Sequence, residues 1–507
     1  MERVKYLKAF GICIFLLLVW VSFSQNFLYA QTAIPAPVAP IEPFSVQWVQ
    51  TYGDSGDSAV AVQPFNNVFL YSGSYNGTFL TLPPAGPSER KGYIRIADSL
   101  TGNDIPFNLN FTSDRTYIDN MALDSQNNII YTGRFSRSTP GNYTVNFNIL
   151  PGGTPDLQGN ITQSAAFVTK ILSNVQYGAT RLIKGTIGGA VVYDTAVDPR
   201  TNDVYVTGSF NGSVDFNPPP HGTGGIRNTL DEDVFITKYS PGATGNSLIY
   251  QWTFSFSNST NPNGNTDRFK DISVDSRTGN IVVAGEVEGR GQPIILPGIG
   301  PVPTIGAHDG IILVLSPMGN ILSYNIFGNL NSGIEIADVK FDYNGDILLS
   351  GIFNGTVNFA PPSMTPLILV TAYPNNPGHQ DTFLVKYSGT NLNPLWGNTY
   401  QPARLYGQPS FPNIEFNRCN EIYIMGWLMG SLTNIGMASG GLSDADMYIL
   451  TVDGGGNNLR SGIFGAPNRY EFFFDGKTGN DGTIMTFSYG TANPAANALK
   501  VVDNFCP

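Results

Sequence analysis

Residues 195–208 read Thr-Ala-Val-Asp-Pro-Arg-Thr-Asn-Asp-Val-Tyr-Val-Thr-Gly, and relatives of this stretch recur along the chain. Each copy has an apolar stretch ending in Asp or a related residue, a short polar turn, and a β-rich stretch that ends in Gly. Seven copies are present, spaced about 70 residues apart. They end at Gly73, Gly133, Gly208, Gly285, Gly351, Gly426 and Ser488. This regular spacing predicts one repeat architecture rather than several unrelated domains.

Each copy is followed by two more strand signals. The third strand is a short apolar run, often with Lys near its end, as in Phe235–Tyr239 and Phe383–Tyr387. The fourth often carries an aromatic residue, as in Trp252–Phe256. Four strands joined by tight turns are typical of one propeller blade. The sequence therefore predicts an all-β fold, a single seven-bladed β-propeller with four antiparallel strands per blade.

The two ends of the repeat region complement each other. Val46–Tyr52 is a fourth-type strand that precedes the first copy, and Ala498–Val502 is a third-type strand at the end. We therefore expect the N-terminal strand to complete the last blade and close the ring, which removes an open sheet edge. Cys419 and Cys506 would then lie in turns on the same face of neighbouring blades, so the sequence also predicts a disulfide between them.

The composition and the N-terminus indicate an exported protein. The net charge is −11 and no basic stripe is present, which argues against a nucleic-acid partner. Basic residues precede an apolar run at 9–22, which predicts a signal peptide over 1–30. A Pro/Ala-rich linker at 31–43 and the propeller at 44–507 complete the expected organisation. No later stretch is apolar enough for a membrane span. We expect a secreted, extracellular or periplasmic monomer.

The repeat resembles the bacterial seven-bladed β-propeller repeat family. The best-matching stretches are Thr195–Gly208, Asp233–Tyr239 and Asp381–Tyr387, and the resemblance covers 44–507. Cys419–Trp427 resembles a cysteine-bearing variant found in exported proteins of the Bacteroidetes type. The resemblance implies an extracellular or envelope binding scaffold, and it brings no catalytic motif.

A polar residue stands four positions before the turn residue in six copies. These residues are Asn120, Asp194, Asp271, Asp338, Asn413 and Glu471. One interpretation is a cation site, because hard cations prefer carboxylate and amide oxygens. The metal candidates are then Asp194, Asp271, Asp338 and Glu471, and a structural Ca²⁺ is the one cofactor this would bring. The favoured alternative is capping of strand ends. The turn residues themselves suit Asx-turns: Asp124, Asp198, Asp275, Asp342 and Asp475.

Two further residue sets admit a binding and a structural interpretation. His221, His308 and His379 fall in the same loop type of consecutive blades, but their spacing matches no metal motif. Trp48, Trp252 and Trp396 could stack on sugars, although packing between blades is favoured because they recur at equivalent positions.

The long loops at 136–165, 289–308 and 360–380 should lie on one face, opposite the short turns. Loops on a rigid frame are where binding usually resides. We therefore expect a non-catalytic scaffold that binds a protein or glycan through this long-loop face. The alternative is a secreted polysaccharide lyase or glycosidase with a site at the channel mouth, and a purely structural surface protein is a third. No nucleophile elbow, P-loop or dinucleotide motif is present.

Overall fold

The computed structural model describes residues 44–506, except for 53–57, 66, 76–90, 112–114, 137–142, 149, 151–156, 162–163, 223, 257–265, 290–291, 331–332, 377, 402–411, 430, 433–436, 439–444, 466–470 and 490–495. The chain divides into two compact units, at 1–42 and 43–507. The predicted signal peptide and linker lie outside the described residues. In the part of the chain that is described, no helix is long and apolar enough to cross a membrane.

The described strands form seven blades of antiparallel strands. The innermost strands are β2 (Ser58–Phe65), β6 (Thr116–Leu123), the end of β11 (Tyr177–Val197), β15 (Arg268–Val274), β21 (Ile334–Phe341), β27 (Asn413–Phe416) and β33 (Glu471–Gly479). The second strands are β3 (Val68–Tyr75), β7 (Ile129–Ser136), β12 (Val204–Asp215), β16 (Ile281–Val287), β22 (Ile347–Phe353), β28 (Ile422–Met429) and β34 (Gly482–Tyr489). The third strands are β4 (Lys91–Asp98), β10 (Ser164–Ile171), β13 (Ile226–Ser240), β19 (Asp309–Leu315), β25 (Asp381–Tyr387), β31 (Ala445–Val452) and β35 (Ala496–Asp503). The outer strands are β5 (Asp104–Asn110), the start of β11, β14 (Ile249–Phe256), β20 (Ile321–Phe327), β26 (Pro394–Tyr400), β32 (Asn458–Phe464) and β1 (Phe44–Tyr52).

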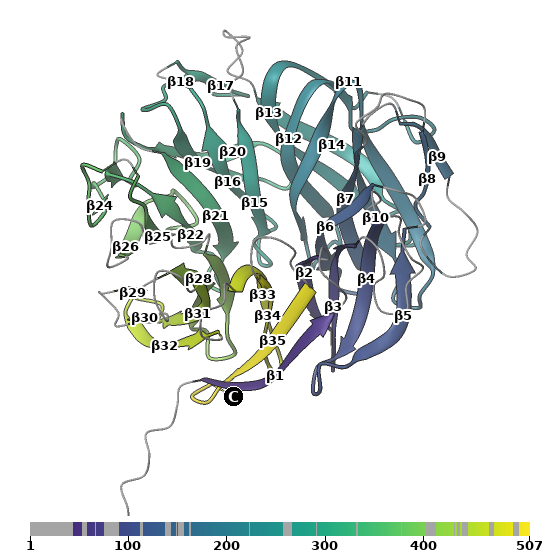
Figure 1. Cartoon of the computed structure of the whole chain (residues 1–507). Helices are drawn as coiled ribbons and strands as arrows, with labels where there is room; N and C mark the ends of the chain where they lie inside the picture. Colours follow the sequence, from purple (N-terminus) through teal and green to yellow (C-terminus); the bar gives the residue numbers. More distant parts are fainter. Residues whose placement is uncertain are drawn as a thin grey trace, which may run out of the picture. The chain divides into compact units, whose positions relative to one another are not determined.

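The inner strands form a closed circle. Each one contacts the inner strand of the next blade, and β33 of blade 7 contacts β2 of blade 1. In Figure 1, β2, β6, β15, β21 and β33 lie toward the middle, while β5, β26 and β32 lie outside. The fold is therefore a seven-bladed β-propeller, as the repeat predicts.

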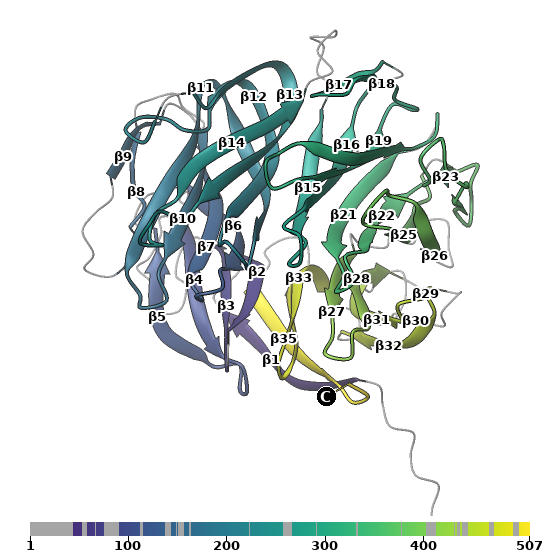
Figure 2. The ribbon, with the colours of Figure 1, turned by 180° about the vertical axis from the view of Figure 1, so that it is seen from behind.

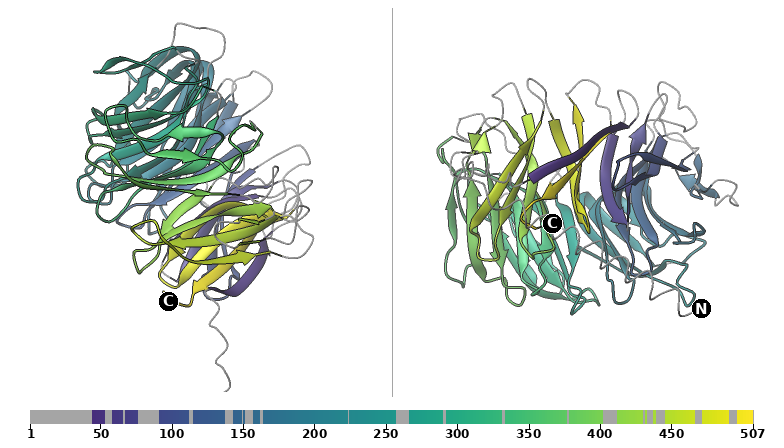
Figure 3. Two further views of the ribbon diagram at one scale, coloured as in Figure 1. Left: turned by 90° about the vertical axis from the view of Figure 1, so that its left-hand side faces the viewer. Right: turned by 90° about the horizontal axis from the view of Figure 1, so that it is seen from below.

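The N-terminal strand closes the last blade, which confirms the predicted seam. β1 pairs antiparallel with β35, with Phe44 opposite Asp503 and Gln50 opposite Ala498. Figure 3 shows this purple strand lying against the yellow C-terminal strands. The Trp48 indole N–H also donates to the Ser99 carbonyl of blade 1, at 3.1 Å. The two ends of the propeller are thus held together by a full strand pairing.

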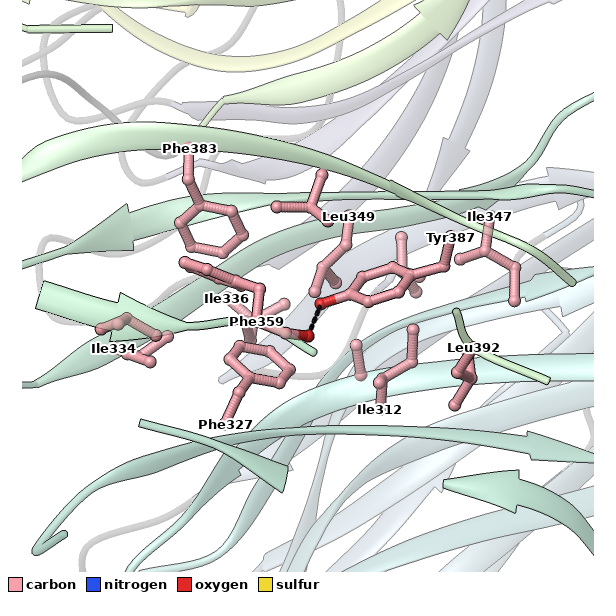
Figure 4. Packing of buried hydrophobic residues seen from close by; sticks show 14 of the residues in the cluster. Ile312, Phe327, Ile334, Ile336, Ile347, Leu349, Phe359, Phe383, Tyr387 and Leu392 are labelled. Atoms are coloured by element: carbon pink, nitrogen blue, oxygen red, sulfur yellow. Dashed lines mark hydrogen bonds between the residues drawn. The ribbon is translucent and has the colours of Figure 1, made fainter. Parts of the chain in front are cut away.

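The core lies between blades, because each sheet is covered on both faces. Strands β19, β22 and β25 are buried along their entire length, which explains why they are apolar without alternation. Figure 4 shows one such layer, where Ile312 and Phe327 of blade 4 pack against Leu349 and Phe383 of blade 5. Burying one such side chain contributes about 1.5–3 kcal/mol.

Blades 2 and 3 share one continuous strand, which the sequence does not predict. β11 pairs with β10 at its start and with β12 at its end, so the two blades form a seven-stranded sheet. β11, β12 and β13 lie side by side (Figure 2). Gly188 lets the shared strand bend, with φ at 91°. A Cβ there would lie 2.2 Å from the Asn211 carbonyl oxygen, so no other residue fits.

The three equivalent tryptophans pack between blades, as favoured from the sequence. Each indole N–H donates to a carbonyl in the outer turn of the next blade. The acceptors are Ser99 for Trp48 (3.1 Å), Pro317 for Trp252 (3.3 Å) and Gly454 for Trp396 (3.0 Å). A glycine of the same turn lies against the indole ring, since a Cβ on Gly456 would be 2.9 Å from Trp396.

The predicted disulfide joins the last two blades. Cys419 and Cys506 are bonded, with Cα atoms 6.1 Å apart. Arg460 on β32 reinforces the junction through ion pairs to Glu421 and Asp503. The C-terminal turn after β35 is therefore tied to blade 6 by a covalent bond and by charge.

Candidate functional site

A ring of polar side chains surrounds the central channel. Six inner strands carry a β-bulge, and a bulge bends a strand and redirects a side chain. The residue just after the bulge is Ala61, Asn120, Asp194, Asp271, Asp338 or Asp475. Most of these residues line a channel cavity of about 210 Å³, together with Asn413 of blade 6. The structure thus brings together three of the four predicted metal candidates, Asp194, Asp271 and Asp338.

Glu471 does not join this ring, because the register expected for blade 7 is wrong by four residues. Asp475 is paired with Thr486 in the middle of the strand, and the turn comes after Gly479. The glycines at 476 and 479 resemble a turn in the sequence, but both continue the strand, and Gly482 is the one with positive φ. Asp475 is therefore the channel residue of blade 7 and makes no Asx-turn, while Glu471 is buried near the start of β33.

The channel carboxylates bind the backbone of the next blade. In each case one carboxylate oxygen accepts a hydrogen bond from the first backbone N–H after the equivalent residue. The pairs are Asp194 with Ile272 (3.1 Å), Asp271 with Val339 (2.6 Å), Asp338 with Ile414 (2.7 Å) and Asp475 with Val62 (3.0 Å). The side chain of Asn120 adds a bond to Asp194 at 2.6 Å. These contacts support the structural interpretation, in which the polar residues satisfy backbone groups between neighbouring blades.

Three of these carboxyl groups are protonated more readily than free aspartate. Burial and the neighbouring Asp194 charge raise the pKa of Asp271 well above its ordinary value. Burial also raises the pKa of Asp338, against the effect of Lys340. Asp271 hydrogen-bonds to both Asp194 and Asp338, so the three groups share protons.

A second layer of the channel is closed by opposite charges. The residue two positions after the channel residue on each inner strand has a small side chain in blades 2 to 4. In blades 5 to 7 this residue is Lys340, Glu415 and Lys477, respectively. Glu415 forms ion pairs with both lysines. Burial alone would lower the pKa of Lys477, but nearby carboxylates outweigh it and raise that pKa well above its ordinary value. The departures from the repeat in these blades therefore form one salt-bridged cluster across the channel.

The contribution of Asp271 to the stability of the protein should fall as pH rises from about 4, the unfolded pKa of aspartate. Above that pH the Asp271 carboxyl group binds a proton more often in the folded state than in the unfolded state, because its folded pKa is raised. Asp271→Asn removes the charge and keeps an acceptor for Val339. We expect this variant to have a higher denaturation midpoint than the wild type at pH 7. The midpoints of the variant and the wild type should become equal near pH 4. Chemical denaturation across this range measures it, and a difference independent of pH would contradict it.

The remaining predicted residues occupy structural positions. Asp124, Asp198, Asp275 and Asp342 each accept N–H groups from their own turns, as Asx-turns require. His379 is buried against Asp381 at 2.7 Å, while His308 is exposed and lies 3.2 Å from Glu288. His221 is exposed in blade 3. The three histidines belong to no common metal-sized cluster among the described residues.

The long-loop face carries a groove between blades 4 and 5. Small hairpins rise between the second and third strands: β8 (Tyr143–Asn146) with β9 (Leu157–Ile161), β17 (Ile294–Leu296) with β18 (Gly300–Val302), β23 (Thr356–Asn358) with β24 (Ile368–Val370), and β29 (Ser431–Leu432) with β30 (Met437–Ala438). The β23–β24 hairpin forms one wall of a groove of about 710 Å³. It is lined by Ile305, Gly328, Asn329, Leu330, Asn354, Gly355, Thr356, Asn358, Ile368, Pro374 and Asn375.

The described lining of the groove contains no charged residue and combines amide groups with exposed apolar side chains. Leu330 and Ile368 are 78% and 57% exposed. The loops beneath are held by hydrogen bonds, such as Asn329 Nδ2 to the Thr356 carbonyl at 2.8 Å. Because hydrogen bonds hold these loops, the wall of the groove presents a preformed surface to a ligand. The length of the loops predicts this face from the sequence. The individual residues that line the groove follow no sequence pattern that would identify them.

Comparisons with known proteins bear on the fold alone. No protein-family profile matches the chain, and no curated protein matches it either. Solved structures similar to it are β-propellers. A quinohemoprotein alcohol dehydrogenase from Pseudomonas putida HK5 shares 9% identity, covering 92% of this chain and 78% of that one, with a TM-score of 0.43. A polysaccharide lyase of family PL25, an ulvan lyase, shares 11% identity over 89% of this chain and 94% of its own, with a TM-score of 0.44.

Proposed function

We propose that this chain is a secreted or envelope-associated binding scaffold of the bacterial seven-bladed repeat type, without catalytic activity. Its ligand is a protein or a glycan that docks on the long-loop face. The observation that supports this most is the uncharged groove between blades 4 and 5, where amide groups lie beside exposed apolar side chains. Glycans and neutral peptide segments present the same mixture of hydrogen-bonding groups and apolar faces.

The state of the channel also favours a scaffold. An inverting or retaining glycosidase needs two carboxyl groups, about 5–9.5 Å apart, that are free to act on the substrate. Here the channel carboxylates of Asp194, Asp271, Asp338 and Asp475 each hold a backbone N–H of the next blade. Carboxylates that accept these hydrogen bonds stabilise the contacts between blades and are not free to act on a substrate.

A secreted polysaccharide lyase or glycosidase is the second candidate. It draws on two separate groups of charged residues on and next to the inner strands. In blade 2, burial raises the pKa of Asp119 to about 6 beside Arg134. Lys270 lies 3.7 Å from Glu286 and over the ring of Tyr193. A carboxyl group with such a pKa can act as a general acid or base near neutral pH. Release of new reducing or unsaturated ends from a panel of polysaccharides would favour this candidate.

The scaffold proposal is tested by a glycan array and a matched pair of variants. Leu330→Glu with Ile368→Glu places charge in the groove at exposed positions. Leu322→Glu changes an exposed leucine, 53% accessible, on the outer strand β20 outside the groove. We expect the groove variant to lose binding of array ligands at least tenfold and the β20 variant to retain it. Equal binding by both variants would show that the groove is not the binding site.

A further inference from the structure

Four carboxylates gather at the boundary between blades 3 and 4, on the long-loop side. Asp231 and Asp233 stand two residues apart on β13, so both point to the same face of the strand. Asp267 precedes β15 and Glu288 follows β16. All four are at least nine-tenths buried, with exposed fractions of 7%, 1%, 0% and 7%.

Backbone contacts hold these residues close together. The Asp267 N–H donates to the Glu232 carbonyl at 2.8 Å, which places Asp267 beside the two β13 aspartates. The Glu288 N–H donates to Asp267 Oδ1, also at 2.8 Å. The cluster is therefore fixed by the main chain of both blades, not by mobile side chains.

Two of the four carboxylates, Asp231 and Asp267, lack a counter-charge among the described residues. Asp231 and Asp267 form no ion pair with any described residue, and their Oδ2 atoms are buried without a hydrogen-bond partner there. The exposed His308 side chain lies 3.2 Å from Glu288 at the rim of this boundary. Burial and the surrounding carboxylates raise the pKa of Asp267 to about 8. Buried carboxylates without a counter-charge are costly, so such a site favours a bound cation or a proton.

The next blade boundary serves as an internal comparison. The equivalent positions there are Ala307, Asp309, Ile334 and Asn354, so one carboxylate stands in place of four. That carboxylate, Asp309, accepts N–H groups from Ile305 and Gly306. The boundary between blades 4 and 5 thus has one acidic residue at these positions, and the other three acidic residues have no acidic counterpart there.

We propose that Asp231, Asp233, Asp267 and Glu288 form a binding site for one divalent cation, and that this cation is Ca²⁺. Oxygen-only ligands, several of them carboxylates, match the preference of Ca²⁺, which also accepts water and irregular geometry. No three of the four side chains offer carboxylate oxygens that all lie within 4.8 Å of one another. Binding of the ion would require Asp231 and Asp267 to move closer together, which would tighten the contact between the two blades.

Calorimetric titration and thermal unfolding of the full exported protein test this, after removal of metal with EDTA and with CaCl₂ as the probe. We expect one binding event per chain and a rise in Tm with Ca²⁺. Asp267→Asn, nearly isosteric, should stay folded in EDTA, bind Ca²⁺ at least tenfold more weakly and lose the rise in Tm. Asp271→Asn, in the separate channel cluster, should respond as wild type does.

Two results would overturn the proposal. One is the absence of any heat or Tm change with millimolar CaCl₂ in the wild type. The other is a Ca²⁺ response of Asp267→Asn equal to that of the wild type. Should Asp267→Asn fail to fold in EDTA, as judged by circular dichroism, Asp231→Asn replaces it with the same expected and contrary outcomes.

Discussion

Replacing Glu415 with Gln should lower the free energy of unfolding by about 3 kcal/mol, the lower end of the effect for a buried ion pair, because it leaves two partly buried lysines without their shared partner. Glu415 forms ion pairs with Lys340 and Lys477 inside the channel. Lys340 retains Asp338 at 3.6 Å and Lys477 retains Asp475 at 3.9 Å, so part of the interaction survives. Urea-induced unfolding followed by tryptophan fluorescence measures the change.

The matched control is Glu335→Gln, an exposed glutamate on β21. Its effect should lie within about 0.5 kcal/mol of zero, as for most surface changes. A variant with Leu at 415 and Met at both 340 and 477 should recover most of the lost stability, since it removes all three charges together. A loss below about 1 kcal/mol for Glu415→Gln would show that the cluster is not a stabilising tie across the channel.

Removing the disulfide should lower the free energy of unfolding by about 4–5 kcal/mol in the chain-entropy description of cross-links. Cys419 and Cys506 are 87 residues apart, so their bond closes a long loop in the unfolded chain. The variant is Cys419→Ser with Cys506→Ser, compared with wild type under oxidising and reducing conditions. Chemical denaturation should give the same midpoint for the variant and for reduced wild type.

The outcome that contradicts this prediction is a variant as stable as the oxidised protein. Mass mapping of the exported protein supplies an independent check, because it should find one peptide that contains both cysteines. Two free thiols would exclude the bond directly.

The repeat predicted the blades because the same physical constraint acts seven times. Strands buried between two neighbouring sheets must be apolar, and turns must carry Asp, Asn or Gly, so the pattern survives in every copy. The seam and the disulfide followed from counting strand types at the two ends. The expected register of blade 7 was wrong because the glycines at 476 and 479 resemble a turn in the sequence, although both lie within a continuous strand.

The candidate sites were harder to predict, because they are departures from the repeat. Asp231 and Asp267 have no counterparts at the next blade boundary, so a search for recurring residues passes over them. The groove draws on Leu330, Asn354 and Ile368 from separate loops, and only the fold brings these together. Lys340 and Glu415 stand out in the sequence as exceptions to a rule of small residues, but the expected register puts Phe473 in place of Lys477. Their pairing across blades depends on the fold.

The closed ring is tested most directly by a cross-link between its two ends. Gln50 and Ala498 are register partners on β1 and β35, so their Cα atoms lie about 4.5–5.5 Å apart, within disulfide range. Gln50→Cys with Ala498→Cys should form a bond that joins the N-terminal and C-terminal peptides in mass mapping. Val46→Cys with Ala498→Cys should not, because Val46 pairs with Val501. A missing link in the first variant, or an equal link in both, would contradict closure of the propeller by its N-terminal strand.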